Sequence, residues 1–123
     1  MTVDTARQSI DAALRNPVLI EAALALSEDR LHDAEPLLRG RLRDAPTDVA
    51  AIRMMAELAA RIGRLKDSEA LLRRALELAP SFGVARANLA TVLYKQNRFP
   101  EALEQLDAVL AEEGDNPAQQ NLK

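Results

Sequence analysis

Few residues of this chain have the types and spacing that catalysis requires. His32 is the only histidine, and there is no cysteine, so a disulfide, a thiol nucleophile and a thiolate metal site are all excluded. His32 stands beside Asp33 at an expected helix start. We interpret it as a solvated surface histidine, and a Ser–His–acid triad is not expected.

The chain also lacks the residues for a phosphate-binding loop and for a pair of catalytic carboxylates. The four glycines are isolated, so no glycine-rich phosphate loop can form. The Asp and Glu residues fall in turns and on outer helix faces, where they act as solvated charges and partners of the helix dipole. We therefore expect no catalytic residue, metal site or cofactor, and no enzyme activity in this segment. The activity of a longer parent protein is left open.

One basic residue recurs at a fixed spacing, always three residues before an acidic one. One interpretation is a row that binds anions, and the other is an exposed arginine repeated because its turn is repeated. We favour the second. The arginines are Arg30, Arg64 and Arg98, and the acidic residues are Asp33, Asp67 and Glu101.

Composition narrows the class of protein. The 123 residues are 48% hydrophobic but contain only three aromatic side chains, and the formal net charge is −3 without any block of like charge. Nothing in this balance favours a nucleic-acid partner. The longest charge-free apolar run, at 22–26, is far shorter than the roughly 18 residues of a membrane helix. The N-terminus lacks the apolar core of a signal peptide. We expect a cytoplasmic protein without a membrane partner.

The arginine spacing belongs to a larger repeat of 34 residues, which predicts stacked helical hairpins. Helical periodicity and proline or glycine stops divide the chain into hairpins of two helices each. We predict an all-α fold in one domain, 1–123. Its parts are an N-terminal capping helix at 3–15, repeat 1 at 17–46, repeat 2 at 48–80, repeat 3 at 82–114, and the start of a further helix at 117–123.

The first repeat fits this register imperfectly. Strict spacing places Glu21 where Met55 and Leu89 should be buried, so we expect a shift that packs Ala22 and Ala23 and shortens the turn at 27–30 by one residue. Pro36 would disrupt a helix interior. We therefore expect Asp33 to cap its helix, which places Pro36 in the first turn.

The other repeats give clearer patterns of burial. Helices at about 48–62, 65–78, 82–96 and 99–113 each present one apolar stripe. The residues expected to be buried are Ile52, Met55, Ala56, Ala59, Ile62, Leu65, Ser68, Leu72, Ala75, Leu76, Leu89, Ala90, Leu93, Phe99, Ala102, Leu106, Val109 and Leu110.

These residues resemble the tetratricopeptide repeat (TPR), a helix–turn–helix unit of 34 residues. The resemblance covers about 17–123 and rests on a large–small pair in the first helix, a small residue in the second and a closing proline. The matching residues are Met55-Ala56, Leu89-Ala90, Ala34, Ser68, Ala102, Ala75, Pro46 and Pro80. Three positions depart from the pattern. The tryptophan of the signature is replaced by Ile52 and Arg86, and Arg41 stands where a small residue is usual.

Two alternatives compete with this resemblance. An ordinary helical bundle gives no reason for one shared spacing, stop residue and turn motif. The 35-residue repeats that read RNA are disfavoured by the period of 34, the acidic balance and the lack of a basic stripe.

The resemblance implies a right-handed superhelix of about three hairpins, with the first helix of each hairpin lining a concave face. Such a groove would hold an extended or helical peptide. The lysine/asparagine clamp by which some relatives bind a C-terminal carboxylate is not expected, because the clamp positions hold Leu19, Ile20, Ala23 and Val84. The expected groove residues are Arg53, Glu57, Arg61, Asn88, Thr91, Tyr94 and Lys95.

Three functions follow from the resemblance. The first is a non-catalytic scaffold that binds a protein or peptide partner. The second is the N-terminal repeat region of a larger bacterial enzyme, such as a TPR-fused sulfotransferase. The third is a self-assembly module that forms a homo-oligomer through its C-terminal end. There, Leu103, Leu106 and Leu110 exceed what one neighbouring helix can cover. We expect them to be covered either by a second copy or, if the sequence is a fragment, by the missing part of a longer protein.

Overall fold

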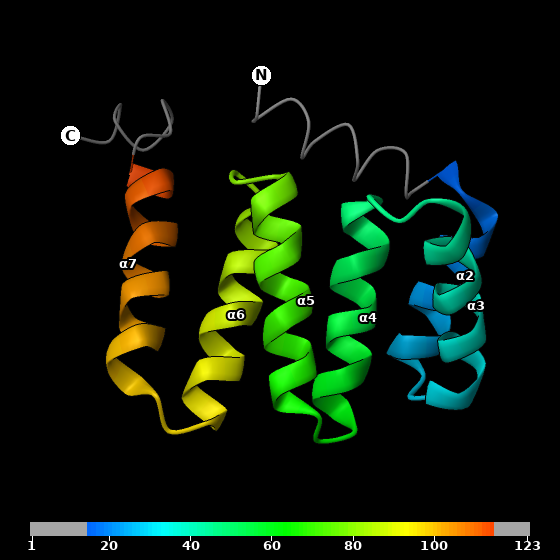
Figure 1. Ribbon diagram of the computed structural model, residues 1–123, viewed down its shortest axis with the longest axis horizontal. Helices are drawn as coiled ribbons and strands as arrows, with labels where there is room; N and C mark the ends of the chain where they lie inside the picture. Colours follow the sequence, from blue (N-terminus) through cyan, green and yellow to red (C-terminus); the bar gives the residue numbers. More distant parts are fainter. Residues whose placement is uncertain (1–14, 115–123) are drawn as a thin grey trace.

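The structure is a computed structural model, and it describes residues 15–114. Six helices follow one another in a row of antiparallel pairs, and these residues contain no strand (Figure 1). The predicted all-α fold of stacked hairpins is therefore confirmed. The expected helix start at 117–123, and all but Arg15 of the capping helix at 3–15, lie outside the described residues. The helices are α2 (Pro17–Ser27), α3 (Leu31–Asp44), α4 (Val49–Arg61), α5 (Leu65–Leu78), α6 (Gly83–Lys95) and α7 (Phe99–Gly114).

The same turn joins the helices of each hairpin. Its middle residue adopts a left-handed backbone, with φ of 60° at Asp29, 84° at Gly63 and 64° at Asn97. Glycine, asparagine and aspartate are the residues that tolerate this conformation best. The arginine that follows donates its backbone N–H to the carbonyl five residues earlier, at 2.7–2.9 Å in all three turns. The turns thus repeat at intervals of 34 residues.

The expected shift in the first repeat is therefore wrong. The turn at 27–30 has the same length as the other two, and strict spacing already brings Ala22 to a buried position equivalent to Ala56 and Ala90. Glu21 and Ala23 are both exposed. Glu21 is tolerated because its face of α2 is solvated, so no slide of the helix is needed to keep the carboxylate out of the core.

The helix starts differ in how they are capped. The Asn16 side chain accepts from the N–H groups of Val18 and Leu19, and Pro17 occupies the first helical position, where its missing N–H costs nothing. Asp48 caps α4 in the same manner, as predicted.

The predicted Asp33 cap is wrong. Helix α3 begins at Leu31, so Pro36 lies in the helix interior rather than in the first turn. The repeated turn fixes the start of α3, because the Arg30 carbonyl already accepts from the N–H groups of Asp33 and Ala34 at 3.2 Å each. Pro36 itself is exposed, so its missing N–H weakens only the solvent side of the helix.

Two hydrophobic clusters form the core, one around α2, α3 and α4 and the other around α4, α5, α6 and α7. Helix α4 contributes buried residues to both clusters, and partly buried Leu42 of α3 packs against both, so the core is continuous. Fully buried alanines such as Ala22, Ala34 and Ala56 keep the helices close together. Each helix packs on the next, and α4 also contacts α2 and α6 across the hairpins.

Ten of the eighteen expected core positions are buried. Met55, Leu65, Leu76 and Val109 are only partly buried, and four positions are exposed. Ile62, Phe99, Leu106 and Leu110 are exposed by 53%, 51%, 46% and 62%. Ile62 follows the last residue of α4 and caps the C-terminus of that helix. The other three lie on α7, whose backbone packs closely on α6 and on no other described helix. A stripe on α7 thus faces solvent within residues 15–114.

No helix among the described residues has both the length and the apolar character needed to cross a membrane.

Candidate functional site

The helices α4, α5 and α6 enclose a groove of about 240 Å³. Its floor includes the buried residues Ser68, Leu72 and Val92. Its sides are polar and come mainly from α4 and α6. Five of the seven predicted groove residues line it, namely Glu57, Arg61, Asn88, Thr91 and Lys95, together with Ala60.

Helical spacing explains why these side chains meet. Glu57 and Arg61 are four residues apart on α4, and Asn88, Thr91 and Lys95 follow at intervals of three and four on α6, so each set shares one helix face. Both α4 and α6 are the first helices of their hairpins. The repeat therefore places the two faces on the same side of the array.

Most of the charge in the groove is neutralised internally. The Glu57 carboxylate lies between two arginines, 3.2 Å from Arg53 Nη1 and 2.8 Å from Arg61 Nη2. Arg53 Nη1 also donates to Asn88 Oδ1 at 3.3 Å, which links α4 to α6. Arg53 borders the groove rather than lining it. Its guanidinium is committed to holding the two helices together.

Arg61 also has a structural role. Its Nη1 donates to the backbone carbonyl of Leu26 near the end of α2, and the same atom lies 3.9 Å from the Asp29 carboxylate. A cation at the C-terminus of a helix is favourable for the helix dipole. Arg61 therefore ties the first hairpin to the second.

Lys95 is the repeat equivalent of Arg61, but its ammonium makes no hydrogen bond or ion pair within residues 15–114. Beside it, Thr91 Oγ1 donates to the Ala87 carbonyl at 3.2 Å and keeps its acceptor lone pairs. Lys95 is therefore the cation of the groove that has no partner in the described part of the chain.

The remaining predicted residue, Tyr94, does not line the groove. It is 63% exposed, and its ring packs edge-on against Phe99 with the ring centres 5.3 Å apart. This pair joins the end of α6 to the start of α7. Tyr94 thus belongs to the exposed surface near α7.

The arginine row has no common role. Arg30 pairs with Glu28 and Asp33, and Arg98 pairs with Glu101 and with Glu69. Hydrogen bonds to Asp33 and then to Glu28 raise the pKa of Arg30 above its ordinary value. Two of the three guanidinium groups are therefore already neutralised. The structure gives no support to an anion-binding row.

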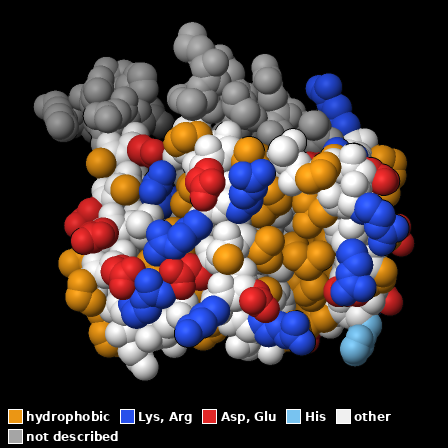
Figure 2. Space-filling model, viewed as in Figure 1, with side chains coloured by type: hydrophobic (Ala, Val, Ile, Leu, Met, Phe, Trp, Pro, Cys, Tyr) orange, Lys and Arg blue, Asp and Glu red, His pale blue; other side chains and the backbone are white. Residues whose placement is uncertain are grey.

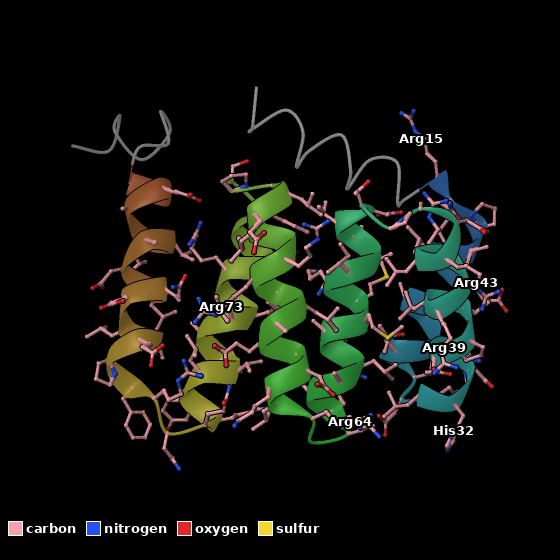
Figure 3. The ribbon with its side chains drawn as sticks, viewed as in Figure 1. Arg15, His32, Arg39, Arg43, Arg64 and Arg73 are labelled. Carbon is pink, nitrogen blue, oxygen red and sulfur yellow. The ribbon has the colours of Figure 1, made fainter. Side chains whose placement is uncertain are left out.

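The other candidates of the sequence lie apart. Figure 3 shows His32 at one end of α3, pointing outward, with Arg64 at the turn between α4 and α5. Both side chains are exposed. Arg64 makes no ion pair within residues 15–114, in agreement with an exposed arginine.

Sequence reasoning missed a polar cluster at the junction of the last two hairpins. The Glu69 carboxylate on α5 accepts from Arg98 Nη1 at 2.6 Å, Arg73 Nε at 3.0 Å and Gln96 Nε2 at 3.1 Å. Burial favours a raised pKa for Glu69, but these three donors outweigh it and hold the pKa below its usual value. Arg98 is held in turn by Glu101 at 2.7 Å. Figure 2 shows acidic and basic side chains mingled over this region.

Part of the chain matches a known family of protein sequences. Residues 63–123 match the family described as Tetratricopeptide repeat. No curated protein sequence matches the chain. The match starts at the turn between α4 and α5, and the same turn and helix pair recur upstream in α2 and α3 with the same spacing. The chain is thus a tetratricopeptide repeat protein.

Proposed function

We propose that this protein is a non-catalytic scaffold that binds a peptide segment of a partner protein in the groove between α4 and α6. Tetratricopeptide repeats commonly mediate interactions between proteins. The observation that carries the proposal is the convergence of five predicted groove residues on one cleft of about 240 Å³.

The chemistry of the groove suggests what the segment carries. Leu72 and Val92 offer an apolar floor for an aliphatic side chain, while Asn88 and Thr91 offer polar contacts to its backbone. Arg53, Glu57 and Arg61 neutralise one another in part and leave Lys95 uncompensated. We therefore propose a peptide with an acidic group next to an aliphatic residue.

Selection from a displayed peptide library tests the proposal. Sequences that pair an acidic with an aliphatic residue should be enriched by the unmodified protein and lost with Lys95→Glu. Lys66→Glu is the matched control, because Lys66 is an exposed lysine on α5 outside the groove. Equal enrichment by both variants, at unchanged melting temperature, would place the binding surface elsewhere.

A second candidate function is self-assembly, which a separate observation favours. Leu103, Leu106 and Leu110 of α7 are exposed by 58%, 46% and 62%, and together with Phe99 they form an apolar stripe. Stripes of this kind mark interfaces on soluble proteins. We propose that a second copy of the chain covers it.

A further inference from the structure

A second pocket lies on another face of α6, between α5, α6 and α7. Its volume is about 310 Å³, and it is lined by Arg73, Leu76, Glu77, Arg86, Leu89 and Gln105. It shares no lining residue with the groove of about 240 Å³. In Figure 3, Arg73 extends from α5 toward the space between α5 and α7.

Arg86 is the unusual residue of this pocket. The equivalent position in the second repeat holds Ile52, a buried apolar residue, so a guanidinium here occupies a packing position. Arg86 Nη1 donates to Gln105 Oε1 at 3.0 Å, and Nη2 donates to the Pro80 carbonyl at 2.9 Å. Both acceptors are neutral. Arg86 Nε is buried and has no acceptor among the described residues.

Arg86 thus lacks a counter-charge. No carboxylate lies within ion-pair distance of it in residues 15–114. Glu77, the acidic residue of the pocket, has a side chain that is 71% exposed and lies 3.9 Å from Arg74. A partly buried cation that has only neutral acceptors and an unsatisfied donor is costly. An anion in the pocket would remove that cost.

The other walls define the anion. Arg73 is already compensated by Glu69, with its Nε 3.0 Å from that carboxylate, so Arg86 contributes the single unbalanced charge. That balance fits one negative charge better than the dianion of a phosphate. Leu76 and Leu89 form an apolar wall suited to a short aliphatic chain. A carboxylate would replace the neutral Gln105 oxygen as the acceptor from Arg86 and form a stronger, charge-assisted hydrogen bond.

We propose that this pocket is a second binding site, which takes a carboxylate on a short aliphatic chain and holds it through Arg86. The same chemistry occurs in a free small carboxylic acid and in the acidic side chain of a partner protein. The proposal does not depend on the peptide groove, because the two sites use different residues.

Titration of the protein followed by NMR tests the proposal, with butyrate and the blocked amino acid N-acetylglutamate amide as probes, each of which carries one carboxylate. We expect saturable shifts of the Arg86 Nε–H signal and of the backbone amides of Leu76 and Gln105, with an affinity in roughly the millimolar range for probes this small. Saturation by butyrate alone would identify a free acid as the ligand. Saturation by both probes would identify an acidic side chain.

Arg86→Gln should weaken binding by about tenfold or more, since it removes the charge-assisted hydrogen bonds. Arg86→Lys, which keeps the charge without the planar fork, should recover part of the affinity. Arg74→Gln is the matched control, because Arg74 is an exposed arginine on α5 outside the pocket. Circular dichroism checks that each variant is folded. If Arg86→Gln does not fold, the affinity of Arg86→Lys for the probes is compared with that of the unmodified protein instead.

Three results would overturn the proposal. The first is the absence of saturable shifts at Arg86 with either probe. The second is equal binding by the folded Arg86→Gln variant. The third is tighter binding of inorganic phosphate than of butyrate, which would contradict the assignment to a carboxylate. Lys95→Glu should leave butyrate binding to this pocket unchanged, so a failure of the proposed peptide groove can be told apart from a failure of this site.

Discussion

Some side chains of this repeat protein pack between the hairpins and stabilise the fold, whereas others lie exposed on the surface and make few contacts. Leu72 is 1% exposed and lies in the core cluster shared by α4, α5, α6 and α7. Arg64 is exposed at a turn and makes no ion pair within residues 15–114. The contrast between them can be measured.

Leu72→Ala should lower the free energy of unfolding by about 2–5 kcal/mol, because it removes buried contacts and leaves a cavity. Arg64→Ala should change it by no more than about 0.5 kcal/mol. Urea denaturation followed by circular dichroism provides both values. A large loss of unfolding free energy from Arg64→Ala would show that this arginine stabilises the fold although it is exposed.

Contacts between individual side chains were also the part of the structure that the sequence could not predict. Helical spacing was sufficient to place Glu57, Arg61 and Lys95 on one face. It could not show that Glu57 lies between two arginines, nor that Tyr94 turns toward Phe99, because rotamers and contacts between helices decide these arrangements. The Glu69 cluster was missed for the same reason, since its partner Arg98 lies 29 residues away in the sequence.

At the scale of the helix, α3 contains the clearest local conflict with helix formation. Pro36 cannot donate to the His32 carbonyl and fixes its own φ, yet α3 continues to Asp44. The proline was predicted to lie in the first turn because propensity favours that place. Stacking of α3 between α2 and α4 overrides this preference.

Pro36→Ala should therefore stabilise the protein by about 1–3 kcal/mol, after allowance for the greater freedom of the unfolded chain. Thermal denaturation of the two proteins measures the difference. The control is Pro100→Ala, because Pro100 already lies in the first turn of α7 and should matter less. A decrease in stability for Pro36→Ala would mean that the proline is needed for the packing of α3.

The junction between α5 and the turn before α7 should be sensitive to acid. The pKa of Glu69 is lower in the folded protein than in the unfolded chain, where the ordinary value is 4.5. Its stabilising contribution is therefore fully present well above pH 4.5 and is lost as the pH falls through the lower folded value. Arg98 remains charged throughout this range.

Glu69→Gln should accordingly lower stability by about 1–2 kcal/mol at neutral pH and flatten its loss below pH 4.5. Urea denaturation at several pH values gives the two profiles. Glu77→Gln, on the same helix but largely exposed, serves as the comparison. Parallel profiles for the unmodified protein and Glu69→Gln would contradict this account of the cluster.

At the scale of the whole molecule, the 34-residue period was sufficient to predict the order of the helices and their stacking. The shortened first turn was a wrong expectation, because one carboxylate, Glu21, was assumed to need a new register. Its side of α2 is exposed, so the repeat geometry persisted. The two pockets could not be predicted, since their shape depends on three helices at once.

The exposed stripe on α7 leads to a prediction about association. Sedimentation velocity should show mass increasing with protein concentration, and Leu103→Glu should reduce that increase while leaving the melting temperature nearly unchanged. Ile62→Glu is the control, because Ile62 is similarly exposed but lies away from α7. A chain that stays monomeric at high concentration would contradict self-assembly through this stripe.

The uniform turn also makes the array modular at the level of the gene. Residues 65–98 run from the start of α5 to the end of the turn before α7, and both Glu69 and Arg98 fall inside this segment. A tandem duplication of these 34 codons would therefore add one hairpin's length of helix and regenerate the Glu69–Arg98 bridge at each copy. Unequal recombination at this spacing would thus lengthen the array by a whole hairpin while keeping the turn and its ion pair.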